Sequence, residues 1–375
     1  MHLVDTTMFF CARGGGVKRY LFAKHEWLKR HAPHIVHTLL VPAPQRAVAG
    51  LQTCDARALR LADGYRLPLD LPAWQRALEN LQPDLVEAAD PYIPAWAARQ
   101  LGRRMGIPTV AFYHSDMPRM LSQRVGGWIA PISRAYLRSL YGGFDLVLAP
   151  SRVMHEELRK ADISPVSVQP LGVDVGIFNP RRRGAELRDR LGLASDARLL
   201  VYAGRFAREK NIAALVGAVQ ALGDPYHLLM IGGRRAERAS RYVTILPYQR
   251  NSERLAAMLA SCDAFLHAGD QETYGLVAAE AMACGLPVVA VGCGAMPEIV
   301  DSEVGGCARR ASASDLAAAV THVFERDVTA LGRAARLRVE QRHSWDCVFR
   351  QLLGHYARLA PRARMPESLP VRAEG

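Results

Sequence analysis

The sequence lacks the features that define several other classes of protein. No apolar run reaches the roughly 18 residues that a membrane-spanning helix needs, and the start, MHLVDTTMFF, has no basic segment before an apolar one. The seven cysteines include no CxxC pair, which argues against a zinc ribbon and a disulfide framework. Half of the residues are apolar and 22% are charged, which excludes a disordered or collagen-like chain. We therefore expect a globular, cytoplasmic protein with reduced cysteines.

Acidic residues are fewer than basic ones in this sequence. The 375 residues include 48 Lys and Arg against 36 Asp and Glu, a formal net charge of +12. Such a surplus attracts phosphates, nucleic acid or an anionic membrane. The arginines are scattered, and no helix-turn-helix, zinc finger or aromatic stacking motif is recognisable, so we expect no nucleic-acid partner.

Apolar runs alternate with amphipathic helical segments along the whole chain, which predicts an α/β fold with parallel sheets. The first series has expected strands at 34–41, 84–88, 108–113, 145–149 and 165–169, and helices near 16–31, 93–105 and 151–160. The second has strands at 198–204, 227–233, 242–248, 263–269 and 286–292, and helices near 210–221, 251–260, 275–284 and 311–325. Each series has the length of one doubly wound, Rossmann-like domain.

The stretch LGVDVGIFNPRRRG separates the two series and has no periodic apolar pattern, as expected of a linker. We predict domains at 1–172 and 173–342, a helix over 343–360 that crosses back to the first domain, and a disordered tail over 361–375. Ligands of such sheets bind beyond the carboxyl ends of the strands, so we expect the domains to face each other across a cleft that holds the site.

A basic loop follows the strand at 198–204. Arg205 and Lys210 stand there, just before a helix that begins near Asn211. A guanidinium, an ammonium and free helix amides together stabilise an anion such as pyrophosphate. The alternative is a solvated loop that is basic because much of the chain is basic.

The segment AGDQETYGLVAAEAMACGLPVVA carries two glutamates eight residues apart, Glu272 in a loop and Glu280 on the second turn of a helix. One carboxylate can reach the hydroxyls of a sugar and the other a ribose. The backbone amides of Thr273, Tyr274, Gly275 and Leu276 would point at a bound phosphate. Two glutamates at this spacing also recur by chance.

This segment resembles the E-x7-E signature of the retaining, nucleotide-sugar-dependent glycosyltransferases of the GT-B fold grouped as family 4. Further blocks agree in order: GGGVKRYL, APSRVMHEEL, PLGVDVGIFNP, YAGRFAREKN and HSWDCVFRQLL. The resemblance implies that Glu272 contacts the donor sugar, that Glu280 contacts the ribose, and that Arg205 and Lys210 bind the diphosphate. A catalytically silent nucleotide-sugar-binding protein, and an epimerase or hydrolase of the same fold, are the alternatives.

In the first half, the resemblance singles out four residues. Gly15 and Gly16 match the family's glycine loop, which approaches the phosphates, although a flexible turn would look the same. His114 matches a histidine beside the transferred sugar and joins Glu272, Arg205 and Lys210 as a catalytic candidate; the alternative is a structural role. Asp116 is a candidate acceptor-side base or a helix cap. No metal-ligand cluster appears, so we expect neither a metal nor another cofactor.

The stretch MPRMLSQRVGGWIAPISRAYLRSLYGG mixes arginines with bulky apolar residues, which suits a helix lying on anionic lipid or an amphipathic helix packed on its own sheet. DLVEAADPY and VAFYHSDMPRML are similar to segments of transferases that glycosylate diacylglycerol, including sulfoquinovosyl synthases. We therefore expect a hexosyltransferase with a nucleotide-sugar donor, UDP-sugar favoured, and a lipid or lipid-linked saccharide acceptor at the inner face of the cell membrane. A GDP-mannose-dependent mannosyltransferase, or a transferase acting on a polysaccharide, is the alternative.

Overall fold

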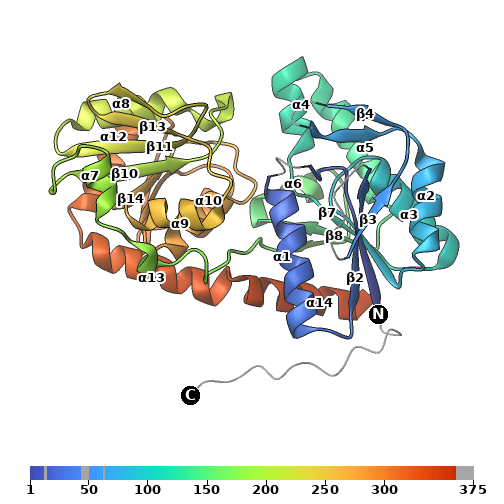
Figure 1. The fold of residues 1–375 in the computed structure, drawn as a ribbon. Helices are drawn as coiled ribbons and strands as arrows, with labels where there is room; N and C mark the ends of the chain where they lie inside the picture. The colour runs from blue at the N-terminus through green and yellow to red at the C-terminus, as the bar shows by residue number, and fades with distance from the viewer. Residues whose placement is uncertain (12–14, 44–49, 62–63, 360–375) are drawn as a thin grey trace. The chain divides into compact units, whose positions relative to one another are not determined.

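The chain folds into two compact units, each an α/β domain (Figure 1). The structure, a computed structural model, describes residues 1–11, 15–43, 50–61 and 64–359. Unit 1 comprises Met1–Gln169 together with the chain from Phe349 onward, and unit 2 comprises Pro170–Val348. The tail expected over 361–375 lies outside the described residues.

Unit 1 is built on a parallel sheet of seven strands in the order β3-β2-β1-β6-β7-β8-β9. The order reverses direction between β1 and β6, which is where the loops at the carboxyl ends diverge and leave room for a ligand. The strands are β1 (His2–Thr6), β2 (Val36–Pro42), β3 (Leu51–Cys54), β6 (Leu85–Ala88), β7 (Thr109–Phe112), β8 (Leu146–Ala149) and β9 (Val166–Val168). β4 (Ala58–Arg60) and β5 (Arg66–Pro68) form a separate hairpin.

Helices cover both faces of this sheet. Val4 and Val86 pack into an apolar cluster with α2, α3, α5 and α6, whereas the residues next to them, Asp5 and Glu87, point to the opposite face, toward α1 and α14. The helices are α1 (Gly16–His31), α2 (Leu71–Asn80), α3 (Ile93–Met105), α4 (Met117–Val125), α5 (Ile129–Tyr141), α6 (Arg152–Lys160) and α14 (Trp345–Leu359), the last of which begins in unit 2.

A buried charge cluster lies between α1, α14 and the sheet of unit 1. The Lys24 ammonium is 1% exposed and lies 2.8 Å from an oxygen of Asp5 and 3.1 Å from one of Glu87. It also donates to the hydroxyl of Tyr356, which in turn donates to Glu87. Burial alone would raise the pKa of Asp5. The interactions with Lys24 and His37 outweigh burial and hold this pKa below its ordinary value. The cluster therefore attaches α1 to the sheet through paired charges and α14 through the hydrogen bonds of Tyr356.

Unit 2 contains a second seven-stranded sheet, ordered β12-β13-β11-β10-β14-β15-β16. All its neighbouring strands run parallel except β12 against β13. The order reverses between β10 and β14, in the middle of the sheet. The strands are β10 (Arg198–Ala203), β11 (Tyr226–Gly233), β12 (Glu237–Ser240), β13 (Val243–Pro247), β14 (Ala264–His267), β15 (Val288–Val291) and β16 (Gly305–Ala308).

In unit 2, α8 and α12 pack together on one face of the sheet, and α9, α10 and α13 lie on the other (Figure 1). α10 is buried all round because α9, α13 and the sheet surround it, which explains why its sequence shows no polar face. The helices are η2 (Pro180–Arg182), α7 (Glu186–Arg190), η3 (Arg208–Lys210), α8 (Ile212–Leu222), α9 (Ser252–Ala260), α10 (Leu276–Ala283), α11 (Met296–Ile299), α12 (Ala313–Phe324) and α13 (Val328–Arg342).

The two doubly wound sheets confirm the predicted fold class, and the helix expected near 151–160 forms as α6, with Ser151 as its N-cap. The interpretation of residues 117–143 as one helix is wrong. The chain forms two helices there, α4 and α5, because Gly126 adopts φ +115°, which a helix does not permit. Within the described ranges, no helix is both long enough and apolar enough to cross a bilayer.

Candidate functional site

Two loops meet at the carboxyl ends of β10 and β14, the neighbouring strands at which the strand order of unit 2 reverses. The loop after β10 contributes Lys210, whose ammonium pairs with the carboxylate of Glu272 in the loop after β14. The side-chain amide of Asn211 donates to the carbonyl of Ala268 at 2.9 Å and joins the same two loops. The structure thus brings together the basic loop and the glutamate segment, which the sequence places 62 residues apart.

Glu272 is held as an anion. Its Oε1 lies 2.9 Å from Nε2 of His267, the last residue of β14, and its side chain is 16% exposed. Burial alone would raise the pKa of Glu272. The contact with His267 and the charge of Lys210 outweigh burial and hold this pKa well below its ordinary value. The carboxylate therefore acts only as a hydrogen-bond acceptor. Sequence reasoning missed His267, although its place at the end of the strand DAFLHAG was the available signal.

The backbone after Glu272 is held in place by close packing. Gly275, the N-cap of α10, has φ +96°, and a Cβ there would lie 2.8 Å from the sulfur of Met296. A Cβ on Gly294 would lie 2.7 Å from the carbonyl oxygen of Glu272, which accepts from the amide of Ala295 at 2.9 Å. The first amides of α10 have no acceptor within the helix, and the helix dipole adds positive potential there.

The other predicted residues of unit 2 differ in their exposure. Arg205 is exposed, whereas Thr273 and Leu276 are half-buried. Glu280 is 3% exposed, within α10. The Tyr274 ring is also buried, and its hydroxyl lies 2.9 Å from Nδ1 of His343. Its side chain therefore points into the interior of unit 2, and only its backbone contributes to the surface of the loop.

Of the unit 1 candidates, His114 lies two residues after the end of β7. Its ring stacks on Phe112 with centroids 4.0 Å apart and lies 5.1 Å from that of Tyr20. Burial, and then the charge of Lys24, lower the pKa of His114 to about 3. The imidazole is therefore neutral near pH 7, so it can make hydrogen bonds but supplies no positive charge.

Asp116 and Gly15 occupy helix N-caps in unit 1. Asp116 accepts from the amide of Arg119 at 3.2 Å and caps α4, which is the alternative foreseen for a loop aspartate. Gly15 precedes α1, which Gly16 opens, and has φ −88°. A Cβ on Gly15 would meet no described atom within 4 Å, so the surroundings that the structure describes do not require glycine there.

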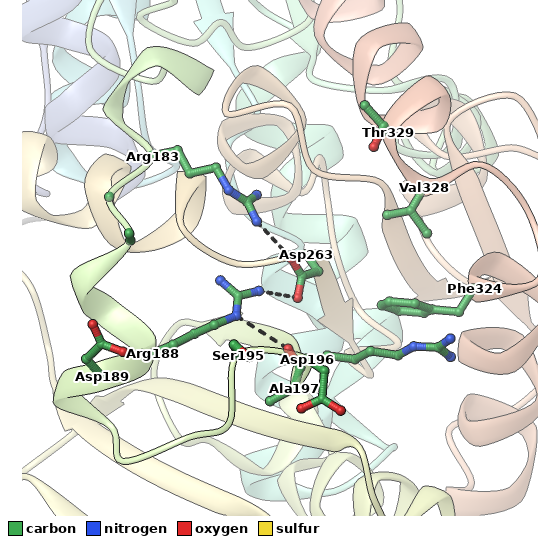
Figure 2. A pocket seen from close by; sticks show the side chains of 13 residues that line it. Arg183, Arg188, Asp189, Ser195, Asp196, Ala197, Asp263, Phe324, Val328 and Thr329 are labelled. Carbon is green, nitrogen blue, oxygen red and sulfur yellow. Dashed lines mark hydrogen bonds and ion pairs between the residues drawn. The ribbon is translucent and has the colours of Figure 1, made fainter.

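A pocket of about 620 Å³ lies at the other end of the unit 2 sheet, beside the amino ends of β10 and β14 (Figure 2). Arg183 and Arg188 line it and bond the two oxygens of Asp263 at 3.0 and 2.5 Å. Both also donate to backbone carbonyls. These bonds tie α7 and the segment before it to the residues just before β14.

Comparisons with known proteins show the family of this chain. Residues 14–176 match the family model described as Glycosyltransferase Family 4, and residues 197–326 match the one described as Glycosyl transferases group 1. A GDP-mannose-dependent alpha-mannosyltransferase of Mycobacterium tuberculosis (strain CDC 1551 / Oshkosh) is 33% identical over 370 residues, which cover 92% of this chain and 94% of that protein. The chain belongs to the family 4 glycosyltransferases.

Among the other relatives of this glycosyltransferase, one is named for a glycolipid. This relative is a GDP-mannose-dependent alpha-(1-6)-phosphatidylinositol dimannoside mannosyltransferase of Mycobacterium tuberculosis (strain ATCC 25177 / H37Ra). It is 29% identical over an alignment that covers 91% of this chain and 92% of that protein. A sulfoquinovosyl transferase of Arabidopsis thaliana is 27% identical over an alignment that covers 68% of this chain and 52% of that protein. A solved sucrose-phosphate synthase from Thermosynechococcus elongatus superposes with a TM-score of 0.77 at 22% identity, over 96% and 98% of the two chains. The predicted family and GT-B fold are confirmed.

Proposed function

We propose that this glycosyltransferase moves mannose, with retention of configuration, from GDP-mannose to a hydroxyl of a lipid or lipid-linked saccharide. The observation that carries the donor assignment is the 33% identity, over nearly the whole chain, to a GDP-mannose-dependent enzyme. The preference for a UDP-sugar rested on glycolipid-like segments alone, and the relatives support GDP-mannose better. The acceptor class rests on the glycolipid in the name of one relative, phosphatidylinositol dimannoside.

The loops at β10 and β14 can supply the necessary chemistry. Arg205, Lys210 and the first amides of α10 hold the diphosphate and stabilise the charge that develops on it as it leaves. Glu272 accepts hydrogen bonds from hydroxyls of the hexose, and Glu280 from the ribose. The bond from the anomeric carbon to the diphosphate breaks, a bond to the acceptor oxygen forms, and the acceptor proton passes to the leaving phosphate. His114 is the unit 1 candidate for a hydrogen bond to the sugar. None of these steps requires a metal ion.

The donor assignment predicts selective thermal stabilisation. GDP-mannose at about 100 times its Kd should stabilise the native protein by about 2.7 kcal/mol, because it binds only the folded state. The melting temperature should then rise by several degrees, whereas UDP-glucose and ADP-glucose at equal concentration should change it little. Differential scanning fluorimetry measures this, and release of GDP from GDP-mannose in the presence of a lipid acceptor tests transfer. Stabilisation by UDP-glucose alone would contradict the assignment.

The surface of α4 and α5 supports a lipid acceptor. Met120, Val125, Trp128 and Ile132 are 43 to 62% exposed there, although large apolar side chains usually avoid water. Exposed arginines accompany them: Arg119, Arg124, Arg134 and Arg138. Bulky apolar side chains enter the acyl boundary of a bilayer while arginines contact anionic head groups. We therefore propose peripheral attachment to an anionic membrane through α4 and α5.

This attachment predicts co-sedimentation with anionic vesicles at low salt. Replacing both Trp128 and Ile132 by alanine should lower the bound fraction severalfold, because both apolar contacts are lost. Leu337→Ala is the matched control, since Leu337 is 53% exposed on α13 of unit 2. If the native protein stays in the supernatant at low salt, or if the control weakens binding equally, the attachment surface is wrong.

A further inference from the structure

A hydrogen bond connects the glutamate segment to the chain segment just before α14. The Tyr274 hydroxyl lies 2.9 Å from Nδ1 of His343, and the two rings meet edge to face at 6.0 Å. The tyrosine is 4% exposed. Its neighbours in sequence are Thr273 and Gly275, which supply backbone to the loop at the N-terminus of α10. The bond therefore acts directly on that loop.

Both partners of this hydrogen bond are neutral near pH 7. Burial, and then the charges of Arg342 and Arg338, lower the pKa of His343 to about 4, so the ring is neutral near pH 7. Burial raises the pKa of Tyr274, which keeps its proton. The bond therefore joins two neutral groups, the phenol hydroxyl and a ring nitrogen of the imidazole, and neither changes its charge near pH 7.

His343 belongs to a junction between two distant chain segments. Its carbonyl accepts from the amide of Val173 at 2.7 Å, and the carbonyl of Val173 accepts from the amide of Trp345 at 3.2 Å. A Cβ on Gly172 would lie 2.3 Å from the Trp345 ring. These segments lie beside the two points at which the chain passes between the units, after Gln169 and after Val348.

We propose that Tyr274 is a positioning residue whose hydroxyl, through His343, holds the loop Thr273–Leu276 against the segments that connect the units. Its bond to His343 orients the backbone amides that face the diphosphate, although its side chain touches no donor atom. Donor affinity then depends on a bond at the junction, and donor binding acts back on the junction through the same bond. This inference rests on the proposed function, because it takes a nucleoside diphosphate as the ligand of the loop.

The test is Tyr274→Phe in the full chain, which removes the hydroxyl and keeps the ring. The dissociation constant for GDP, measured by calorimetry, and the KM for GDP-mannose should each rise about five- to tenfold, while kcat changes less than about twofold. His343→Phe should do the same, and the double variant should be no worse than either single one because one bond is lost in all three. His343→Gln, whose side-chain oxygen can accept the bond, should restore most of the affinity.

Tyr226→Phe is the matched control. Tyr226 is also a buried tyrosine of unit 2, and its hydroxyl accepts from Arg198 at 2.6 Å, but it lies at the amino end of β11. Its GDP affinity should equal that of the native protein. If Tyr274→Phe binds GDP within twofold of native, the inference is overturned and the proposed function stands. If the native protein binds neither GDP nor UDP, both are overturned.

Discussion

Lys210→Ala should lower kcat/KM by at least about 10²–10³-fold, the usual cost of removing one group that stabilises charge in the transition state. Lys210 is a cation at the carboxyl end of β10 and pairs with the Glu272 carboxylate. Its loss removes a charge from the diphosphate site and a partner that lowers the pKa of Glu272. Steady-state kinetics with GDP-mannose measures the loss. Glu272→Ala should abolish transfer in the same way.

Both variants should keep their fold. Lys210 ends the short 3-10 helix η3 and Glu272 lies in a loop, and their side chains are 19% and 16% exposed, so neither belongs to an apolar core. Lys160→Ala is the matched control, because Lys160 also pairs with a glutamate, Glu157, but on the exposed surface of α6. It should keep full activity. Full activity in Lys210→Ala or Glu272→Ala would remove these residues from the site.

Lys24→Met should lower the free energy of unfolding of unit 1 by about 3–5 kcal/mol, the cost of leaving buried charges without their partner. Asp5 and Glu87 both lie within 3.1 Å of the Lys24 ammonium and are 1% and 0% exposed. Methionine would fill the space of the lysine stem without balancing either carboxylate. The loss is seen as a shift in the denaturation midpoint of the unit 1 transition.

Lys29→Met is the control for this variant, since Lys29 is exposed on the same helix, α1. Its effect should stay within about 0.5 kcal/mol. A loss below about 1 kcal/mol in Lys24→Met would mean that the carboxylates find other partners or become protonated. Combining Lys24→Met with Asp5→Asn and Glu87→Gln should recover part of the stability, because no buried charge is then left alone.

The sequence predicted the elements whose signals are local. The bounds of α1 and α3 agree with their apolar periodicity, and a glycine ends α3 in the left-handed conformation. β1 was missed because Asp5 interrupts its apolar run. A buried aspartate is stable there because the fold places the Lys24 ammonium beside it. Residue identities alone therefore could not reveal the charge cluster.

The same distinction applies to the site. Arg205, Lys210 and Glu272 follow strands within short, recognisable segments, so sequence reasoning could name them. His267 also ends a recognisable strand, five residues before Glu272, and was missed although that signal was present. The partner of Tyr274 could not be named, because its role arises from a contact between residues 69 apart. How Gly15, His114 and Asp116 act on the substrate stays a prediction.

The charge cluster also sets the order in which the newly made chain can finish folding. Lys24 leaves the ribosome 332 residues ahead of Tyr356, the hydroxyl that bonds both Lys24 and Glu87. Until Tyr356 emerges, those two charged groups lack that partner, while all of unit 2 is being synthesised. The first unit whose translation begins is thus the last to be completed.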